Sequence, residues 1–346
     1  MNNIWPFLWQ LIKLGIGAVA VLLFMMTAVL YIVLKLRWVI GKIQSRIGPN
    51  RTGGNGWAQT IADALKLFQK EDIVPKGADR WLFTVAPAMV FVPVYLVYAV
   101  IPFGDGLTAS KMNVGVVYLG AVSCMAVIGI VIGGWASNNR WSLLGAFRAA
   151  SQLIAYEIPV ALALCVPVMI AGSLDLTEIV GLQGGGIQNW IIFKAWPMIP
   201  LAFLMLFIAE LAEINVAPFD ITEAESELVA GFNTEYSGMK FALFFLAEFA
   251  ESFTLAAILV TLFFGGPSAP LPILGDTLTG AWGSIVSLLW FIFKSWLLVL
   301  VILWIRSTLP RVRMDKLMNL CWKCLIPTGL ANIMLTALYI VFWVNK

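Results

Sequence analysis

Long apolar stretches alternate with short charged segments along the chain. Eight such stretches occur, at residues 5–34, 82–102, 114–133, 153–171, 196–212, 241–265, 285–305 and 325–344. A membrane-spanning helix needs about 20 mostly apolar residues, whereas the strands of a membrane barrel alternate apolar and polar positions over shorter segments. The pattern therefore predicts an all-α, polytopic membrane bundle of about eight transmembrane helices, organised as a single membrane domain over residues 1–346.

Basic residues are concentrated in every second connection between these stretches. These connections are approximately residues 37–81, 134–152, 213–240 and 306–324, and the third of them contains one basic residue, Lys240. Because loops rich in lysine and arginine stay on the cytoplasmic side, we expect these four to be cytoplasmic and both termini to lie on the outer, periplasmic side. The absence of an arginine-rich presequence favours the bacterial cytoplasmic (inner) membrane as the location.

The first basic connection contains a predicted helix at residues 57–70. Ile61, Leu65 and Phe68 recur at helical spacing and form one apolar stripe, while Lys66 and Lys70 lie off it. This spacing predicts an amphipathic helix. It could lie in the membrane interface or pack on the membrane domain, and the sequence leaves both placements open.

Composition supports a membrane protein and excludes several kinds of site. Hydrophobic residues make up 61% of the chain and charged residues 12%, against about 25% charged in a typical soluble domain. There is no histidine, and Cys321 and Cys324 form a lone CxxC, which is weak evidence for a metal. We expect no metal, haem or iron–sulfur site, no nucleotide-binding domain and no nucleic-acid partner. Any redox centre should belong to a partner subunit, so catalysis by this chain alone is not expected.

Residues 209–240 are unusually acidic for a segment between two apolar stretches. Seven of the chain's 19 acidic residues lie there: Glu210, Glu213, Asp220, Glu223, Glu225, Glu227 and Glu235. An ionised group at membrane depth costs about 2.5–3.5 kcal/mol and usually lines a cavity or ion path. Pro218 predicts a break in the helix near residues 217–220, followed by a short helix. An ordinary solvated acidic loop is the alternative.

Carboxylates also occur inside predicted membrane spans. Glu157 lies in the fourth span, and Glu248 and Glu251 lie in the sixth. An intramembrane acid is a functional-site candidate by default. A buried acid that is hydrogen-bonded for packing is the alternative for Glu157.

Six motifs, in this order along the chain, carry a resemblance to a known family. They are RIGPN (46–50), KEDIVP (70–75), SNNRWSLLG (137–145), RAASQLIAYE (148–157), APFDITEAESELVAGFNTEYSGMKF (217–241) and RSTLPRVRMDKLM (306–318). With them the chain resembles the H-subunit family of respiratory complex I, the proton-pumping NADH:quinone oxidoreductase, over nearly its whole length. It is more distantly similar to the matching subunit of membrane-bound hydrogenases.

The resemblance implies a subunit at the joint between the membrane and peripheral arms of such an enzyme. This chain would bind no cofactor, and partner subunits would hold the iron–sulfur clusters and flavin. The implied partners are peripheral quinone-site subunits, antiporter-like membrane subunits, membrane lipid and quinone (for example ubiquinone) as substrate.

Roles for individual residues also follow from the resemblance. The acidic proton relay would comprise Glu157, Glu213, Glu223, Glu225, Glu227, Glu235 and Glu248. The quinone chamber would involve Arg37, Arg46, Asp63, Phe219 and Asp220. Docking to other subunits would use Arg148, Arg306, Arg311 and Arg313.

The chain departs from the family pattern at two positions. Many members have Glu before the arginine at the end of the first span, as in ERK or ERR, whereas this chain has Leu36, Arg37 and Trp38. Where the family commonly has Arg just before APFD, this chain has Val216. Both positions would lie near the quinone chamber, so its lining should be altered and the type of quinone is left open.

Three other functions remain as alternatives. A related hydrogenase or ferredoxin-dependent complex would use the same kind of subunit, because the electron donor is bound elsewhere. A stand-alone proton-coupled transporter is disfavoured because the two halves of the chain show no internal repeat, which many transporters have. A purely structural anchor would not need carboxylates inside its spans.

Overall fold

The computed structural model describes residues 4–220, 230–270 and 281–344, and every regular element in these residues is helical. This confirms the predicted all-α class. The longer helices are α1 (Ile4–Ile43), α2 (Gln59–Gln69), α3 (Arg80–Val97), α4 (Gly115–Ala136), α5 (Arg140–Ala171), α7 (Met198–Glu213), α9 (Gly238–Phe263), α11 (Ala281–Thr308) and α13 (Ile326–Tyr339). Shorter elements are α6 (Leu176–Gly181), α12 (Met314–Asn319), η1 (Ile187–Asn189), η2 (Ile191–Phe193), η3 (Gly231–Asn233), η4 (Leu320–Leu325) and η5 (Ile340–Val344).

The described residues contain seven helical spans that are long and apolar enough to cross a membrane. They correspond to seven of the eight predicted stretches. The remaining stretch, residues 196–212, forms α7, which is apolar but has only 16 residues. The two short turns η1 and η2 precede it in the chain.

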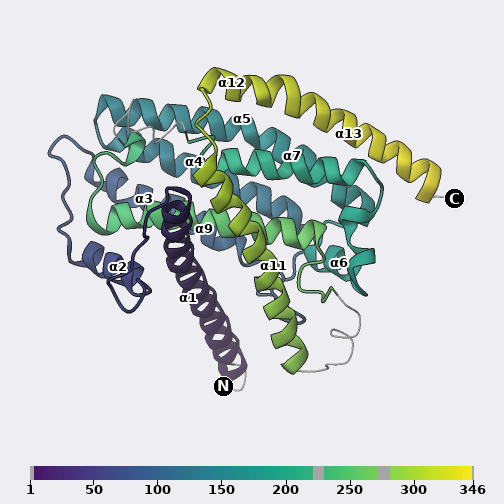
Figure 1. Cartoon of the computed structure of the whole chain (residues 1–346). Helices are drawn as coiled ribbons and strands as arrows, with labels where there is room; N and C mark the ends of the chain where they lie inside the picture. Colours follow the sequence, from purple (N-terminus) through teal and green to yellow (C-terminus); the bar gives the residue numbers. More distant parts are fainter. Residues whose placement is uncertain (1–3, 221–229, 271–280, 345–346) are drawn as a thin grey trace.

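Helix α9 is the central helix of the bundle. It packs against α1, α3, α7 and α11, and Figure 1 shows it passing through the middle of the molecule with α1 and α11 crossing it. Of its most apolar window, 72% is buried inside the chain, against 22–50% for the other spans. The acidic stretch, residues 209–240, ends in the first turn of α9, so its last residues belong to the central helix.

Glycines permit two of the closest backbone approaches. A Cβ on Gly129 of α4 would lie 2.6 Å from Cγ2 of Val90 and 2.9 Å from the Met89 carbonyl carbon, both on α3. A Cβ on Gly145 of α5 would lie 2.8 Å from the Cα of Gly231 in η3. Small residues allow membrane helices to approach this closely, so α3, α4 and α5 form a tight layer against the end of the acidic stretch.

The structure refines the ends of two predicted elements. Helix α1 continues to Ile43, so Arg37 lies on the helix and not in the following loop. Helix α2 confirms the predicted helix in the first connection. The apolar stripe of α2 faces outward, since Ile61, Leu65 and Phe68 are 53%, 57% and 61% exposed.

The predicted break after the fifth span is confirmed. Helix α7 ends at Glu213, and Asn215 has φ 57°, a left-handed conformation that ends a helix. Gln152, which is 1% exposed on α5, donates from Nε2 to the Ala212 carbonyl (2.7 Å) and the Phe219 carbonyl (3.0 Å) on either side of the break. The short helix predicted after Pro218 falls in residues 221–229, outside the described residues.

Candidate functional site

A cavity of about 100 Å³ lies within the bundle, mainly between α3, α4, α7 and α9. Four carboxylates line it, Glu210 and Glu213 from α7 and Glu248 and Glu251 from α9. Each pair is three residues apart, so both members lie on one face of their helix. Among the other lining residues are Ser123, Asn215, Asn233, Thr254 and the apolar side chains of Val94, Leu119, Leu164 and Ile258.

The carboxylates form a continuous series that extends beyond the cavity at both ends. Glu248 interacts electrostatically with Asp220, Glu251 interacts with both Glu248 and Glu213, and Glu213 interacts with Glu157. The series therefore runs from Asp220, just past α7, through α9 and α7 to Glu157 on α5.

Two arginines neutralise one end of this series. Arg306 of α11 pairs with Glu248, with 3.0 Å between Nη1 and Oε1. Arg311 pairs with Asp220, with 3.0 Å between Nη2 and Oδ2. Among the described residues, Asp220 and Glu248 are the members of the series that have an arginine partner. The other end, at Glu213 and Glu157, lacks a paired cation in the described part of the chain.

Several buried polar atoms along the series make no hydrogen bond to described residues. They are Oε1 of Glu157, Oδ1 of Asn215 and Oδ1 of Asp220. Buried polar groups are ordinarily satisfied by protein or by ordered water. The cavity of about 100 Å³ is large enough to hold water beside Asn215 and the four carboxylates that line it.

Helix α4 places two small side chains next to the far end of the series. Ser123 lies beside Glu213, and Cys124 lies beside Glu157. Glu157 itself is half-buried and does not line the cavity. It therefore lies between the interior of the bundle and its outer surface.

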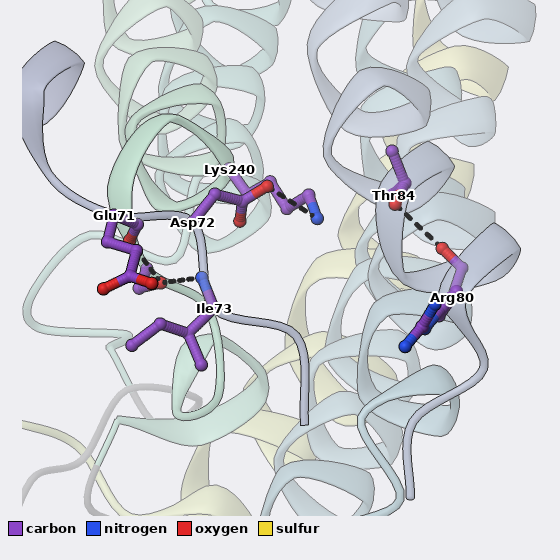
Figure 2. A network of polar contacts seen from close by, with 7 residues as sticks. Glu71, Asp72, Ile73, Arg80, Thr84 and Lys240 are labelled. Carbon is purple, nitrogen blue, oxygen red and sulfur yellow. Dashed lines mark hydrogen bonds and ion pairs between the residues drawn. The ribbon is translucent and has the colours of Figure 1, made fainter. Parts of the chain in front are cut away.

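The end of the acidic stretch is fixed by contacts to the KEDIVP segment. Lys240 Nζ lies 3.0 Å from Asp72 Oδ2, and Figure 2 shows its side chain directed at Asp72. In the same network the Ile73 amide donates to Ser237 Oγ (3.1 Å), and Ser237 Oγ donates to the Glu71 carbonyl (3.3 Å). These contacts hold the first residues of α9 against the connection between α2 and α3.

Tyr236 adds a second attachment at this point. Its ring stacks on Phe83 of α3 at 4.1 Å between centroids, and its hydroxyl donates to the Gly133 carbonyl of α4 (3.3 Å). Burial raises the pKa of the Tyr236 hydroxyl, so it remains a neutral donor. These two contacts fix the position of Tyr236, two residues before α9 begins.

The predicted quinone-chamber residues fall into two groups. Arg37 of α1 pairs with Asp63 of α2, with 2.6 Å between Nη1 and Oδ2, and Arg46 donates from Nε to Gln44 Oε1 (2.6 Å) in the loop that joins these helices. Phe219 and Asp220 instead lie just beyond the end of α7.

The two departures from the family pattern are both apolar core positions. Leu36 is 8% exposed and Val216 is 0% exposed. Because both side chains are apolar, neither adds a charge to the interior. Leu36 directly precedes Arg37, and Val216 lies three residues before Phe219, so each is near one of the two groups of chamber residues.

Other predicted site residues lie apart from the cavity. Glu235 accepts a hydrogen bond from Asn139 Nδ2 (2.7 Å) in an open cleft of about 360 Å³ that also includes Arg140 and Trp141. Arg148 lies on α5, and Arg313 lies 3.6 Å from Asp315 in an exposed pair. Glu223, Glu225 and Glu227 fall outside the described residues.

Two cavity carboxylates are absent from the predicted relay. Glu210 and Glu251 both line the cavity, and they interact electrostatically with each other. Their spacing from Glu213 and Glu248 is the signal that the sequence offers, because residues three apart share a helix face. That spacing does not tell which face turns inward.

Among the described residues, no group of three or more histidine, cysteine or acidic side chains has an arrangement that could hold a metal ion. Cys321 is buried and donates to the Ala155 carbonyl (3.1 Å), whereas Cys324 is exposed. The two cysteines of the CxxC therefore point into different environments.

Comparison with known proteins identifies relatives that match almost the whole chain. The family model described as NADH dehydrogenase matches residues 16–337. The H subunit of the NADH-quinone oxidoreductase of Chlorobium luteolum is 45% identical over 337 residues, covering 95% of this chain and 89% of the relative. The corresponding protein of Geobacillus kaustophilus is 47% identical over 331 residues, covering 95% of each chain. That of Paraburkholderia phymatum is 41% identical over 345 residues, covering 99% of this chain and 94% of the relative.

Proposed function

The chain belongs to the NADH dehydrogenase family that comprises the H subunits of complex I, and from this premise we propose that its carboxylate series carries charge from a quinone chamber into the membrane arm. The chain is one membrane subunit of an NADH-quinone oxidoreductase complex. It would supply no redox centre itself. Iron–sulfur clusters and flavin would lie in partner subunits, and antiporter-like membrane subunits would receive the charge signal.

The observation that carries the proposal is the unbroken order of the series. It begins at Asp220, beside the predicted chamber residue Phe219, and continues through Glu248, Glu251 and Glu213 to Glu157. Reduction of a quinone removes protons from nearby groups and so changes the charge at the first end. Because each acid interacts with the next, that change would shift the proton occupancy of the whole series.

The chain's own residues have distinct roles in this scheme. Arg306 and Arg311 would balance the negative charge at the chamber end through their ion pairs with Glu248 and Asp220. Glu251, Glu213 and Glu157 would hold and pass protons. Glu223, Glu225 and Glu227 are retained as relay members on the sequence alone, and Glu235 would act from the neighbouring cytoplasmic cleft.

The quinone chamber would use Arg37, Asp63 and Arg46 on one side and Phe219 with Asp220 on the other. The Arg37–Asp63 ion pair supports this, because it joins the cytoplasmic end of α1 to an amphipathic helix whose apolar stripe is exposed. Such a corner is where an apolar quinone tail could enter from lipid. Docking of peripheral subunits is proposed for Arg148 and Arg313.

The location follows from the same scheme. We place the chain in the bacterial inner membrane, with the basic connections in the cytoplasm and both termini in the periplasm. Arg80 begins α3, Arg140 begins α5, and Arg306 lies in the last turn of α11. All three would then face the cytoplasm. This arrangement puts the chamber residues on the same side as the peripheral subunits.

The proposal is tested by Glu213→Gln in the assembled complex, reconstituted in vesicles. Loss of an exchangeable proton should lower quinone-coupled turnover and proton translocation at least about tenfold, while the subunits remain in their normal ratio. Glu178→Gln is a matched control, because Glu178 lies on α6, away from the cavity, and hydrogen-bonds Ser173. Full activity in both Glu213→Gln and Glu251→Gln would remove the relay assignment.

A further inference from the structure

The ammonium group of Lys35 is surrounded by aromatic rings at the cytoplasmic end of α1. Its Nζ lies 5.0 Å from the ring centroid of Tyr31, 4.9 Å from that of Trp38 and 6.0 Å from that of Trp57. A cation within about 6 Å of an aromatic centroid is attracted by the ring face. We call Tyr31, Trp38, Trp57 and Trp296 the Lys35 cage.

The rings of the cage come from three separate parts of the chain. Tyr31 and Trp38 lie on α1 four residues before and three residues after Lys35, so all three share one helix face. Trp57 ends the loop that precedes α2 and meets Trp38 edge to face at 5.4 Å. Trp296 comes from α11 and meets Tyr31 edge to face at 4.5 Å. The cage therefore joins α1, α11 and the loop at residues 44–58.

Backbone contacts show how closely this loop returns to α1. Trp38 Nε1 donates to the Pro49 carbonyl at 3.4 Å, and the Arg46 amide donates to the Gly41 carbonyl at 2.8 Å. A Cβ on Gly48 would lie 2.9 Å from Cδ1 of Trp38. The loop thus packs directly on the indole that also contacts Lys35.

In the described part of the chain, the Lys35 ammonium contacts aromatic rings and forms no ion pair with a carboxylate. The neighbouring Arg37, in contrast, has an acidic partner, Asp63. Lys35 is also next to the first departure from the family pattern. Leu36 there is buried in the core, and Trp38 belongs to the cage.

We propose that Lys35 is a positioning residue: its cage fixes the loop at residues 44–58 against α1 and thereby places Asp63 opposite Arg37. Trp57 is the last aromatic residue before α2, and Asp63 follows it by six residues. Release of Trp57 would therefore free the start of α2 and with it the partner of Arg37. This inference rests on the quinone chamber assigned above to Arg37 and Asp63.

The test is Lys35→Met in the assembled complex, with two readouts. Hydrogen exchange of the amides at residues 46–58 should become about three- to tenfold faster, because the loop loses one of its attachments to α1. The KM for quinone should rise about three- to tenfold while kcat stays within about twofold, because placement and not chemistry is changed. Lys35→Arg should restore both values, since a guanidinium also binds aromatic faces.

Two further variants separate the cage from a general effect of charge. Lys42→Met removes an exposed lysine from the last turn of the same helix and should change neither readout. Trp57→Leu should reproduce Lys35→Met, and the double variant should be no worse than either single one, because both remove the same contact.

The outcomes that overturn the inference are distinct from those that overturn the chamber. Unchanged exchange in Lys35→Met, or defects that Lys35→Arg fails to restore, would refute the cage as the attachment of the loop. If Lys35→Met shows faster exchange with an unaltered KM, while Arg37→Ala raises KM, the positioning role of Lys35 is refuted. An unaltered KM in Arg37→Ala would refute the chamber, and the inference would fail with it.

Discussion

Arg306 and Glu248 form an ion pair between α11 and α9 in the interior of the bundle. Their side chains are only 23% and 17% exposed, and the guanidinium also lies 4.9 Å from the Phe249 ring centroid. A charge removed from water needs a partner of opposite sign. Arg306 therefore supplies Glu248 with an opposite charge, which no described ion pair supplies to Glu210, Glu213 or Glu251.

Replacing Arg306 should damage both stability and coupling. In Arg306→Met the Glu248 carboxylate is left buried without its cation, which should lower the unfolding free energy of the complex by up to about 3 kcal/mol. Thermal denaturation of the complex and proton translocation per turnover would measure this. Adding Glu248→Gln should recover the stability but not the translocation.

The exposed pair of Arg313 and Asp315 provides the control for this prediction. Their side chains are 84% and 80% exposed, and exposed pairs contribute about 0–1 kcal/mol. Asp315→Asn breaks this exposed pair and should therefore leave the denaturation temperature nearly unchanged. If Arg306→Met behaved like Asp315→Asn, the pair with Glu248 would not be essential to the interior charge balance.

Among the helices, the contact of α3 with α4 depends on the absence of a side chain at Gly129. Its Cβ would lie closer to the Met89 and Val90 backbone than real Cβ atoms approach, and backbone cannot move without separating the helices. Gly120 lies on the same helix, and a Cβ there would meet nothing within 4 Å. The two positions therefore form a natural pair for comparison.

Gly129→Ala should destabilise the complex by about 1–3 kcal/mol, the usual cost of forcing extra volume into a packed interior. Gly120→Ala should be neutral or stabilise it by up to about 1 kcal/mol, because alanine favours a helix more than glycine does. Thermal denaturation of the two complexes in the same detergent would measure the difference. Equal effects would mean that the α3–α4 contact can separate at little cost.

The sequence predicts the helices well because each span is a long apolar run, but it predicts their ends poorly. Helix α1 extends to Ile43 because its last turns pack against the returning loop, which is a tertiary contact. The pattern of charges indicates acids at the end of α7 and in α9, and the structure brings four of them to one cavity. The inclusion of Glu210 and Glu251 depends on which helix faces meet, and helical spacing within one segment does not specify that.

The sequence also does not specify which charged side chains pair with each other. Arg306 and Arg311 lie in a basic connection, which suggests docking to other subunits, yet they pair with Glu248 and Asp220 within the chain. A positive charge in a loop shows the side of the membrane but not its partner. The cage around Lys35 escapes sequence reasoning for the same reason, since its rings come from three segments.

In the whole molecule, exposed tryptophans mark one boundary of the membrane. Trp81, Trp135 and Trp141 are 83%, 63% and 55% exposed, and they lie at the start of α3, the end of α4 and the start of α5. These ends are adjacent, because the Asp79 amide donates to the Ala136 carbonyl (3.1 Å). Tryptophan concentrates at membrane–water interfaces, so this cluster indicates that the Asn139–Glu235 cleft lies at one border of the membrane.

The outer faces of the bundle indicate that the chain works within a larger assembly. Large apolar residues are exposed along α11, α13 and η5, including Leu289, Phe293, Leu338 and Val341. Lipid alone could cover them. The carboxylate series, however, reaches the half-buried Glu157 and has no described acid beyond it, so a proton or charge path needs a neighbouring membrane subunit to continue.

Purification of the chain from its own membrane in mild detergent should therefore recover it with other subunits. Because the described residues hold no converging metal ligands, iron and flavin absorbance in the sample would report partner subunits directly, and mass spectrometry would identify them. Antiporter-like subunits together with iron–sulfur subunits would establish both ends of the path, since one end needs an electron input and the other a proton-translocating neighbour. Recovery of the chain alone, with proton transport intact in vesicles, would instead favour a stand-alone proton-coupled transporter, because the series would then have to complete its path within a single chain.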